Sequence, residues 1–137
     1  MRVGEEQRFL RAVWARLPTE PCSGCTDCAA RCAGGLQMTR TEFEAIRTYL
    51  GAGGWFPRVR RQAQMAAPCE FQREDAPWCL IYPVRPLICR LFGLVVWLPC
   101  PTGRVPVLVA DGPEIMRAYA AFDRRTYREW LRVVAKE

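Results

Sequence analysis

The hydrophobic positions near the start of the chain recur with the period of an α-helix. In the stretch EEQRFLRAVWARL, residues 5–17, the apolar side chains of Phe9, Val13 and Leu17 fall on one helical face. Pro18 follows directly, and a proline cannot continue a helix. The pattern therefore predicts an amphipathic helix over residues 5–17 that buries one face.

A second helical pattern begins after Thr39. Thr39 with Glu42 three positions later is a capping-box signature, in which the two side chains satisfy the free N–H groups at a helix start. Phe43 and Ile46 continue an apolar stripe, and glycines from Gly51 onward mark its end. We expect a helix over about residues 40–50.

The last part of the chain carries a longer helical pattern. Asp111 and Glu114 repeat the capping signature with an acid as the cap, and Pro113 suits a first helical turn. Behind them apolar residues recur on one face, namely Ile115, Tyr119, Phe122, Trp130 and Val134. These spacings predict a single helix over about residues 112–135.

Strand-like patterns are confined to the region before that last helix. Residues 94–98, LVVWL, and residues 104–110, RVPVLVA, are apolar runs joined by PCPTG, and they predict a β-hairpin. Before them, Pro86 suits the start of a short helix in LICRLF. The predicted fold is mainly α: one small helical domain over residues 1–137, with cysteine-rich loops and a minor β-hairpin.

Composition and charge fit a folded protein and argue only weakly for nucleic acid. Half of the 137 residues are hydrophobic and a quarter are charged, the balance of a globular domain rather than of a disordered chain. The net charge is +6, and Lys136 is the only lysine. Because the arginines are scattered, we expect solvated faces and ion pairs more than a phosphate-binding stripe.

The chain contains no histidine, which narrows its chemistry. Histidine-based catalytic triads and zinc fingers with mixed cysteine and histidine ligands are excluded, and the commonest general base is missing. All eight cysteines can act as ligands, so no catalytic group can be named. We leave enzymatic activity open and favour a binding protein.

The apolar segments are too short to cross a membrane. The longest, LFGLVVWLP at 91–99, falls well short of the ~20 residues that a spanning helix needs. The start of the chain lacks the apolar core and cleavage site of a secretory signal. We therefore expect a cytoplasmic protein without a membrane partner, and in that reducing compartment cysteines serve as metal ligands more often than as disulfides.

The first cysteines crowd into the segment PCSGCTDCAARC, residues 21–32. They are Cys22, Cys25, Cys28 and Cys32. Two residues between thiols let both reach one ion, and the spacing matches the bacterial ferredoxin run, in which three cysteines bind one cubane cluster and the fourth binds another. Ala33 stands where ferredoxins carry a proline, so the match is one of spacing. Ordinary buried thiols are a weaker interpretation, because no apolar periodicity surrounds these residues.

The other cysteines are widely spaced along the middle of the chain. They are Cys69, Cys79, Cys89 and Cys100. Cys89 lies in an apolar run and on its own could be a core residue. Eight thiolates suffice for two four-thiolate zinc sites, for two cubane clusters, or for one of each.

The stretch CLIYPVRPLICR is the most specific pattern in the sequence. It resembles the signature of the YkgJ-type cysteine-cluster family, bacterial proteins described as zinc- or iron-chelating, whose pattern combines a CxxCxxCC-like opening, a cysteine, C-x-IY-x-x-RP-x-x-CR-x-F and a further cysteine. The residues that carry the resemblance are Cys22, Cys25, Cys28, Cys69, Cys79, Ile81, Tyr82, Arg85, Pro86, Cys89, Arg90, Phe92 and Cys100. It spans about residues 22–100 and leaves the outer helices, about 5–17 and 112–135, unmatched. Ala29 replaces the second cysteine of the adjacent pair, and Cys32 follows one helical turn later.

The resemblance implies metal or cluster binding through the eight cysteines, and the residues beside them suggest supporting roles. Arg85 and Arg90 flank Cys89, where they could offset thiolate charge and donate hydrogen bonds to sulfur. Tyr82 would shape the turn and shield the site. The alternative for the two arginines is ion pairing with acidic residues in the preceding segment, Glu70, Glu74 or Asp75.

Three function classes remain open at this point, of which the last, a metal-dependent enzyme or accessory subunit, has no catalytic group that can be named. The first is a protein whose thiolates hold one or two iron–sulfur clusters, of the [4Fe-4S] type, in a structural, electron-transfer or redox-sensing role. The ferredoxin-like opening and the lack of two separated CxxC knuckles favour it over zinc. The second is a zinc-stabilised binding module whose arginines contact nucleic acid or an acidic protein partner.

Overall fold

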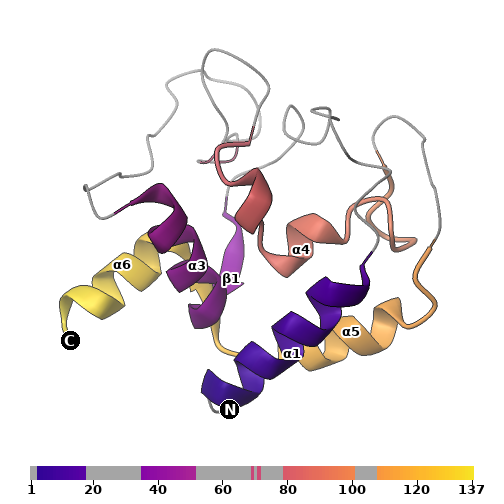
Figure 1. Ribbon diagram of the computed structural model, residues 1–137, viewed down its shortest axis with the longest axis horizontal. Coiled ribbons are helices and arrows are strands. Elements are labelled where there is room, and N and C mark those ends of the chain that lie inside the picture. Colours follow the sequence, from indigo (N-terminus) through magenta and orange to yellow (C-terminus); the bar gives the residue numbers. More distant parts are fainter. Residues whose placement is uncertain (1–2, 18–34, 52–68, 70, 72–78, 101–107) are drawn as a thin grey trace.

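Helices dominate the part of the chain that the computed structural model describes, which is residues 3–17, 35–51, 69, 71, 79–100 and 108–137 (Figure 1). In chain order the elements are α1 (Val3–Arg16), β1 (Gln37–Thr39), α3 (Arg40–Leu50), the 3-10 helix η2 (Tyr82–Val84), α4 (Leu87–Arg90), α5 (Gly112–Ala120), β2 (Arg124–Thr126) and α6 (Tyr127–Ala135). The predicted fold class, a small helical domain with a minor antiparallel β element, is confirmed.

The first two predicted helices form close to their expected ends. The residues of α1 that share its apolar face, Leu10 and Val13, are buried, as is Leu17 just beyond it. At the start of α3 the capping box is complete: Thr39 and Glu42 exchange hydrogen bonds, with the Glu42 N–H donating to Thr39 Oγ1 at 3.2 Å. Gly51 ends α3 at a φ of 87°, a left-handed conformation that favours glycine.

The predicted single helix over 112–135 is wrong in its continuity, because α5 and α6 are separated by β2. The backbone of β2 pairs with β1, with Gln37 opposite Thr126 and Thr39 opposite Arg124, and extended residues cannot at the same time be helical. Thr126 then starts α6 with its own capping box, in which the Glu129 N–H donates to Thr126 Oγ1 at 3.2 Å. The Thr-x-x-Glu signal was present in the sequence.

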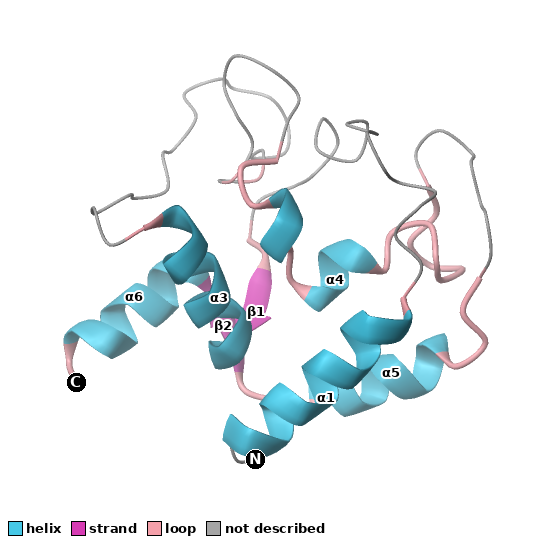
Figure 2. Ribbon diagram, in the orientation of Figure 1, coloured by secondary structure: helices cyan, strands magenta, loops and turns pink. Residues whose placement is uncertain are grey.

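The minor β element also lies elsewhere than predicted. Residues 94–98 form turns with an isolated bridge between Val95 and Leu98. Residues 104–107 of the expected partner strand, 104–110, lie outside the described residues, and from its described end the Val109 N–H donates to the Leu94 carbonyl at 2.8 Å. The two strands in the described part of the chain are β1 and β2, which lie side by side (Figure 2). Burial accounts for only part of the apolar run at 94–98: Leu94 and Val95 are 2% exposed, whereas Val96 and Trp97 are 75% and 46% exposed.

Asp111 occupies the position before α5 but does not cap it with its side chain. Its carboxylate accepts hydrogen bonds from the guanidinium of Arg16 at the end of α1, at 2.5 and 3.1 Å. Gly112 follows and lies against Val95, whose Cγ1 would be 2.8 Å from an added Cβ. This close approach explains the glycine at the start of α5.

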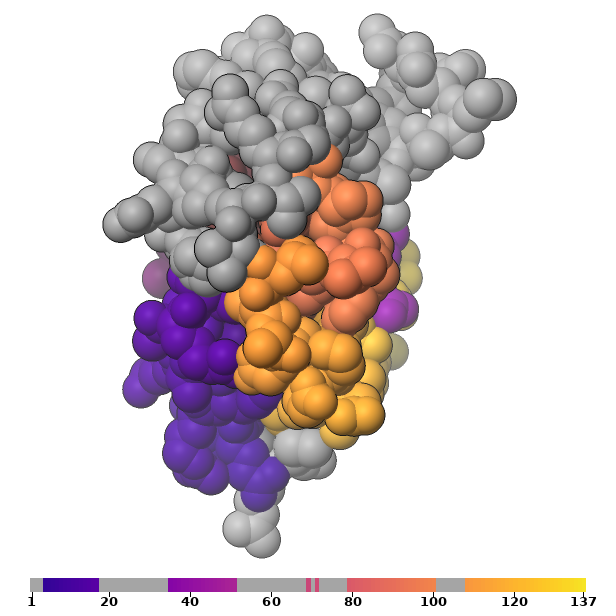
Figure 3. All heavy atoms as spheres, turned by 90° about the vertical axis from the view of Figure 1, so that its right-hand side faces the viewer, coloured from indigo at the N-terminus to yellow at the C-terminus, as the bar shows by residue number. Residues whose placement is uncertain are grey.

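Two apolar clusters form the interior. The α1–α5 core contains Leu10, Val13, Leu17, Leu87, Leu91, Leu94, Val95, Ile115, Tyr119 and Phe122. The α3–α6 core contains Met38, Phe43, Ile46, Cys69, Phe71, Ile81, Tyr127 and Trp130. In Figure 1, α3 and α6 lie on one side and α1 and α5 on the other, with α4 above α1. Figure 3 shows α1, α5 and the segment 79–100 in contact on one face.

No helix in the described ranges combines the length and the apolar character needed to cross a lipid bilayer.

We expect Thr126→Ala to lower the free energy of unfolding by about 1 kcal/mol, because the start of α6 loses its side-chain acceptor. Thr126→Ser keeps the hydroxyl and should unfold close to the wild type. Urea denaturation followed by circular dichroism measures both. Equal stability of the Ala variant and the wild type would contradict a role for this cap.

Candidate metal centre

The signature stretch between Cys79 and Cys89 folds into the short 3-10 helix η2 followed by the first residues of α4, both held by backbone hydrogen bonds. The Tyr82 N–H donates to the Cys79 carbonyl at 3.3 Å, and the Val84 N–H donates to the Ile81 carbonyl at 2.9 Å, which makes the single turn of η2. The Cys89 N–H then donates to the Pro86 carbonyl at 3.0 Å as α4 begins. Both cysteines are partly buried. The backbone at each end of the signature is therefore fixed locally.

Cys69 lies near this turn in space. Cys69 is 7% exposed and belongs to the α3–α6 core, and Cys79 packs against the same core. The Leu80 N–H donates to the Phe71 carbonyl at 2.8 Å, which joins the two cysteine-bearing segments. The fold thus brings Cys69 and Cys79 to the same core, with the backbones of Phe71 and Leu80 bonded, as a shared ligand set requires.

The remaining predicted ligands are placed less completely. Cys100 is partly buried at the end of the 93–100 segment. The first four predicted ligands, Cys22, Cys25, Cys28 and Cys32, lie outside the described residues. Among the residues that are described, no group of three or more cysteine or acidic side chains converges closely enough to hold an ion. The assignment of all eight cysteines as ligands stays a prediction.

Arg85 folds back on the turn that precedes it. Its Nε donates to the Tyr82 carbonyl at 3.0 Å, and its guanidinium carbon lies 3.9 Å from the centre of the Tyr82 ring. Tyr82 therefore provides a surface on which the arginine stacks, as cations do on aromatic faces. The turn-shaping role that we expected for Tyr82 fits this contact.

Arg90 closes the same turn from the other end. Its Nε donates to the Arg85 carbonyl at 2.7 Å, its Nη2 donates to the Pro83 carbonyl at 3.1 Å, and its guanidinium carbon lies 4.7 Å from the centre of the Trp14 ring of α1. Both arginines thus bond backbone carbonyls. The acidic residues of the alternative interpretation lie outside the described residues.

The charge of Arg90 is coupled to that of Cys89. Burial lowers the pKa of Arg90 and the nearby Arg85 lowers it further, while the negative charges of Glu42 and of the Cys89 thiolate oppose this shift. By the same interaction, the guanidinium favours the ionised form of Cys89. The thiolate is the form that binds metal, so this arrangement suits a ligand.

Glu42 is the residue that sequence analysis undervalued. It was identified only as a capping partner of Thr39, yet its carboxylate is 1% exposed and accepts three hydrogen bonds. The donors are the Thr39 N–H at 2.9 Å, the Tyr119 hydroxyl at 2.5 Å and the Leu87 N–H. The capping signal places Glu42 at the start of α3. Its contacts with Leu87 and Tyr119, which lie 45 and 77 positions further along the chain, leave no signal in the local sequence.

Burial sets the ionisation of this carboxylate. Removal from water raises the pKa of Glu42, and the three hydrogen bonds reduce the shift without reversing it. Burial also raises the pKa of Tyr119, and the charge of Glu42 acts in the same direction. Tyr119 is therefore the proton donor in this pair.

A family comparison agrees with the signature stretch. The model of the CxxCxxCC family, a proposed zinc- or iron-chelating domain, matches residues 21–122. The chain belongs to the CxxCxxCC family. A search among curated proteins and a search among solved structures found no match.

The CxxCxxCC match extends further than the expected 22–100. It includes all eight cysteines, η2 and α4, and it continues through α5 to Phe122, whereas α1 and α6 lie outside it. Glu42 and Tyr119 both fall within the matched region. The family assignment supports metal binding in general and leaves zinc and iron as alternatives.

We expect Arg90→Lys to lower the free energy of unfolding by about 1–3 kcal/mol, because lysine cannot reproduce a fork that reaches two carbonyls. Arg117→Lys is the matched control, since the Arg117 side chain is 75% exposed and pairs with Glu114 on the surface. Urea titration of both variants measures the difference. Equal effects would show that the carbonyl contacts of Arg90 contribute little.

The raised pKa of Glu42 predicts a pH dependence. Above the ordinary carboxyl value of 4.5 the unfolded chain releases a proton that the folded protein retains, so the free energy of unfolding should fall as the pH rises through this window. The pKa values of Asp111, Glu129 and Glu137 are lowered, so their contributions to the free energy of unfolding change at pH values below this window. Glu42→Gln should flatten the decline measured between about pH 4.5 and 7. An unchanged slope in the variant would assign the decline to other groups.

Proposed function

We propose that this CxxCxxCC protein holds one or two iron–sulfur clusters, of the [4Fe-4S] type, through its cysteine thiolates. The observation that carries the proposal is the donor set: eight cysteines and no histidine. A purely thiolate set suits cubane clusters and four-cysteine zinc sites alike. The ferredoxin-like spacing from Cys22 to Cys32 favours the cluster.

The described residues support thiolate ligation at the second half of the set. Cys79 and Cys89 lie at the two ends of one hydrogen-bonded turn, and the guanidinium of Arg90 favours a thiolate at Cys89. Arg85 donates to one backbone carbonyl and Arg90 to two, so they would contribute positive charge and a fixed turn to the site. When bound, a [4Fe-4S] cluster would supply one-electron chemistry or a structural cross-link.

The proposed role is structural, electron-transferring or redox-sensing rather than catalytic. The chain has no histidine, the commonest general base, and all eight of its cysteines can serve as ligands. Reduced thiols are most easily kept in the cytoplasm, which is where we place the protein. A partner protein that exchanges electrons with the cluster, or reads its state, is part of the proposal.

The alternative, a zinc-stabilised module that binds nucleic acid or an acidic partner through arginine, has less support. Several arginines of the described residues are paired with acids on the surface, including Arg16 with Asp111 and Arg40 with Glu137. Arg85 and Arg90 are engaged with the backbone. A phosphate-binding surface would need guanidinium groups that are available to phosphates, and these groups are engaged with carboxylates and carbonyls of the protein itself.

Anaerobic purification provides the deciding test. We expect a brown protein that absorbs near ~400 nm and contains about four irons and four sulfides per cluster. A colourless protein with stoichiometric zinc would overturn the iron–sulfur assignment and support the alternative. Chelation of either metal should unfold the cysteine-bearing region, because metal binding and folding are coupled.

Cys89→Ser tests the ligand assignment at α4. The variant should contain less iron than the wild type by the content of one cluster, or less zinc by one ion if the metal is zinc. The reason is that a serine hydroxyl is a poor substitute for a thiolate ligand. Elemental analysis together with circular dichroism separates metal loss from unfolding. A soluble, fully metallated variant would remove Cys89 from the ligand set.

A further inference from the structure

The Glu42 carboxylate joins three segments that are distant in sequence. One oxygen, Oε1, accepts hydrogen bonds from the Thr39 N–H before α3 and from the Tyr119 hydroxyl of α5. The other oxygen, Oε2, accepts the Leu87 N–H at the first residue of α4. Because all three contacts are buried, each donor depends on this carboxylate for its partner.

The start of α4 needs an acceptor from outside its own segment. The first N–H groups of a helix have no partner within it, and the residue before α4 is Pro86, whose side chain makes no capping bond. The Cys89 and Arg90 N–H groups both donate to the Pro86 carbonyl, at 3.0 and 3.2 Å. The Leu87 N–H is satisfied by Glu42, which caps α4 from α3.

Cys89 is therefore held between two anchors. On one side, two residues earlier, Glu42 binds the backbone of Leu87. On the other side, Arg90 binds the carbonyls of Pro83 and Arg85. Since α4 is only 4 residues long, a shift at its first residue moves Cys89 with it.

The electrostatic effects of Cys89 on two neighbouring groups reflect how close it lies to this network. A negative charge on Cys89 raises the pKa of Tyr119, after the larger effects of burial and of Glu42. The same charge opposes the lowered pKa of Arg90. The thiol is thus within electrostatic reach of the hydroxyl that donates to Glu42 and of the guanidinium that closes the turn.

We propose that Glu42 is a positioning residue for Cys89: its carboxylate fixes the start of α4 and thereby places the thiolate for metal binding. This inference rests on the proposed function, because it takes Cys89 as a ligand. Glu42 does not touch the metal; it acts through the backbone of α4.

Glu42→Gln tests this role with little change in shape. A glutamine side chain has one acceptor oxygen and one NH₂ group, whereas the carboxylate presents acceptors on both sides. In one orientation of the amide, its oxygen accepts from the Leu87 N–H and its NH₂ group points at the Thr39 N–H. In the opposite orientation, the NH₂ group points at the Leu87 N–H. In either orientation the amide donor meets a backbone donor, so the hydrogen bond that holds the start of α3 or the start of α4 is lost.

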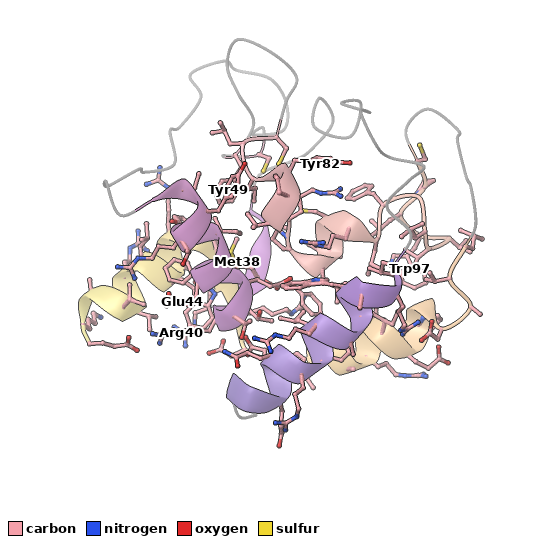
Figure 4. The ribbon with its side chains drawn as sticks, viewed as in Figure 1. Met38, Arg40, Glu44, Tyr49, Tyr82 and Trp97 are labelled. Carbon is pink, nitrogen blue, oxygen red and sulfur yellow. The ribbon has the colours of Figure 1, made fainter. Side chains whose placement is uncertain are left out.

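Glu44→Gln is the matched control. Glu44 lies on the same helix and forms an exposed ion pair with Arg40 at 3.5 Å, and Figure 4 shows the two side chains close together on α3. The substitution removes the same charge from a side chain that is 46% exposed and pairs with Arg40. Its effect reports the general cost of neutralising a glutamate on this helix.

The measurement is the reaction of each cysteine with N-ethylmaleimide in the anaerobically isolated metal-bound protein, resolved by mass spectrometry. We expect Cys89 to be protected in the wild type and in Glu44→Gln. In Glu42→Gln it should react about 10-fold faster, which corresponds to the lower end of the ~10–100-fold loss of metal affinity seen when a residue that orients a ligand is removed. Cys69 and Cys79, which α4 does not carry, should stay protected.

Each outcome bears on one of the two proposals. If Cys89 reacts freely in the metal-bound wild type, it is not a ligand, and the proposed function fails at this residue. If Cys89 is protected in the wild type and equally protected in Glu42→Gln, the positioning role alone is overturned. A uniform rise in the reactivity of all cysteines would identify Glu42 as a purely structural residue and would also overturn it.

Tyr119→Phe keeps the test decisive if Glu42→Gln does not fold. It removes one donor from the carboxylate and leaves the charge in place. We expect a smaller increase in Cys89 reactivity, again without a change at Cys79. Reactivity identical to the wild type in this variant would count against positioning through Glu42.

Discussion

A buried carboxylate with three donors is the constraint on which the arrangement of this molecule depends. Glu42 links α3 to the start of α4 and to α5, at the junction between the two apolar cores. Apolar packing alone would allow these cores to slide against each other, since it is not directional. The hydrogen bonds fix their relative position, because each displaced donor would be left buried without an acceptor.

The signature turn from Cys79 to Arg90 gains its shape from the same kind of interaction. Arg85 and Arg90 bond carbonyls of the turn and stack on Tyr82 and Trp14, so two charged residues act mainly as internal ties. Their positive charge remains close to Cys89 and favours its thiolate form. A sequence motif that identifies a metal-binding family therefore also encodes the scaffold that holds its cysteine.

Local signals predicted most of the helices and failed where a distant contact decided the outcome. The capping box at Thr39 and Glu42 and the proline before α4 placed α3 and α4 correctly. The Thr126 and Glu129 pair was equally local, but the apolar spacing from Ile115 to Val134 suggested one helix, and only pairing with β1 makes the break necessary. Residues 94–98 resembled a strand because β-branched and aromatic residues are frequent in strands, yet they form turns with one isolated bridge in which only Leu94 and Val95 are buried.

The sequence by itself determined the donor chemistry. The absence of histidine excludes imidazole ligands whatever the fold, and eight cysteines make thiolates the expected donors of a metal site, because side-chain identity sets ligand chemistry. It also determined the local caps, which involve residues only three positions apart. The tertiary structure decided that Glu42 anchors α4 and that Arg90 meets Trp14 of α1. Such contacts join residues far apart in the chain, and they exist only after the two cores have packed against each other.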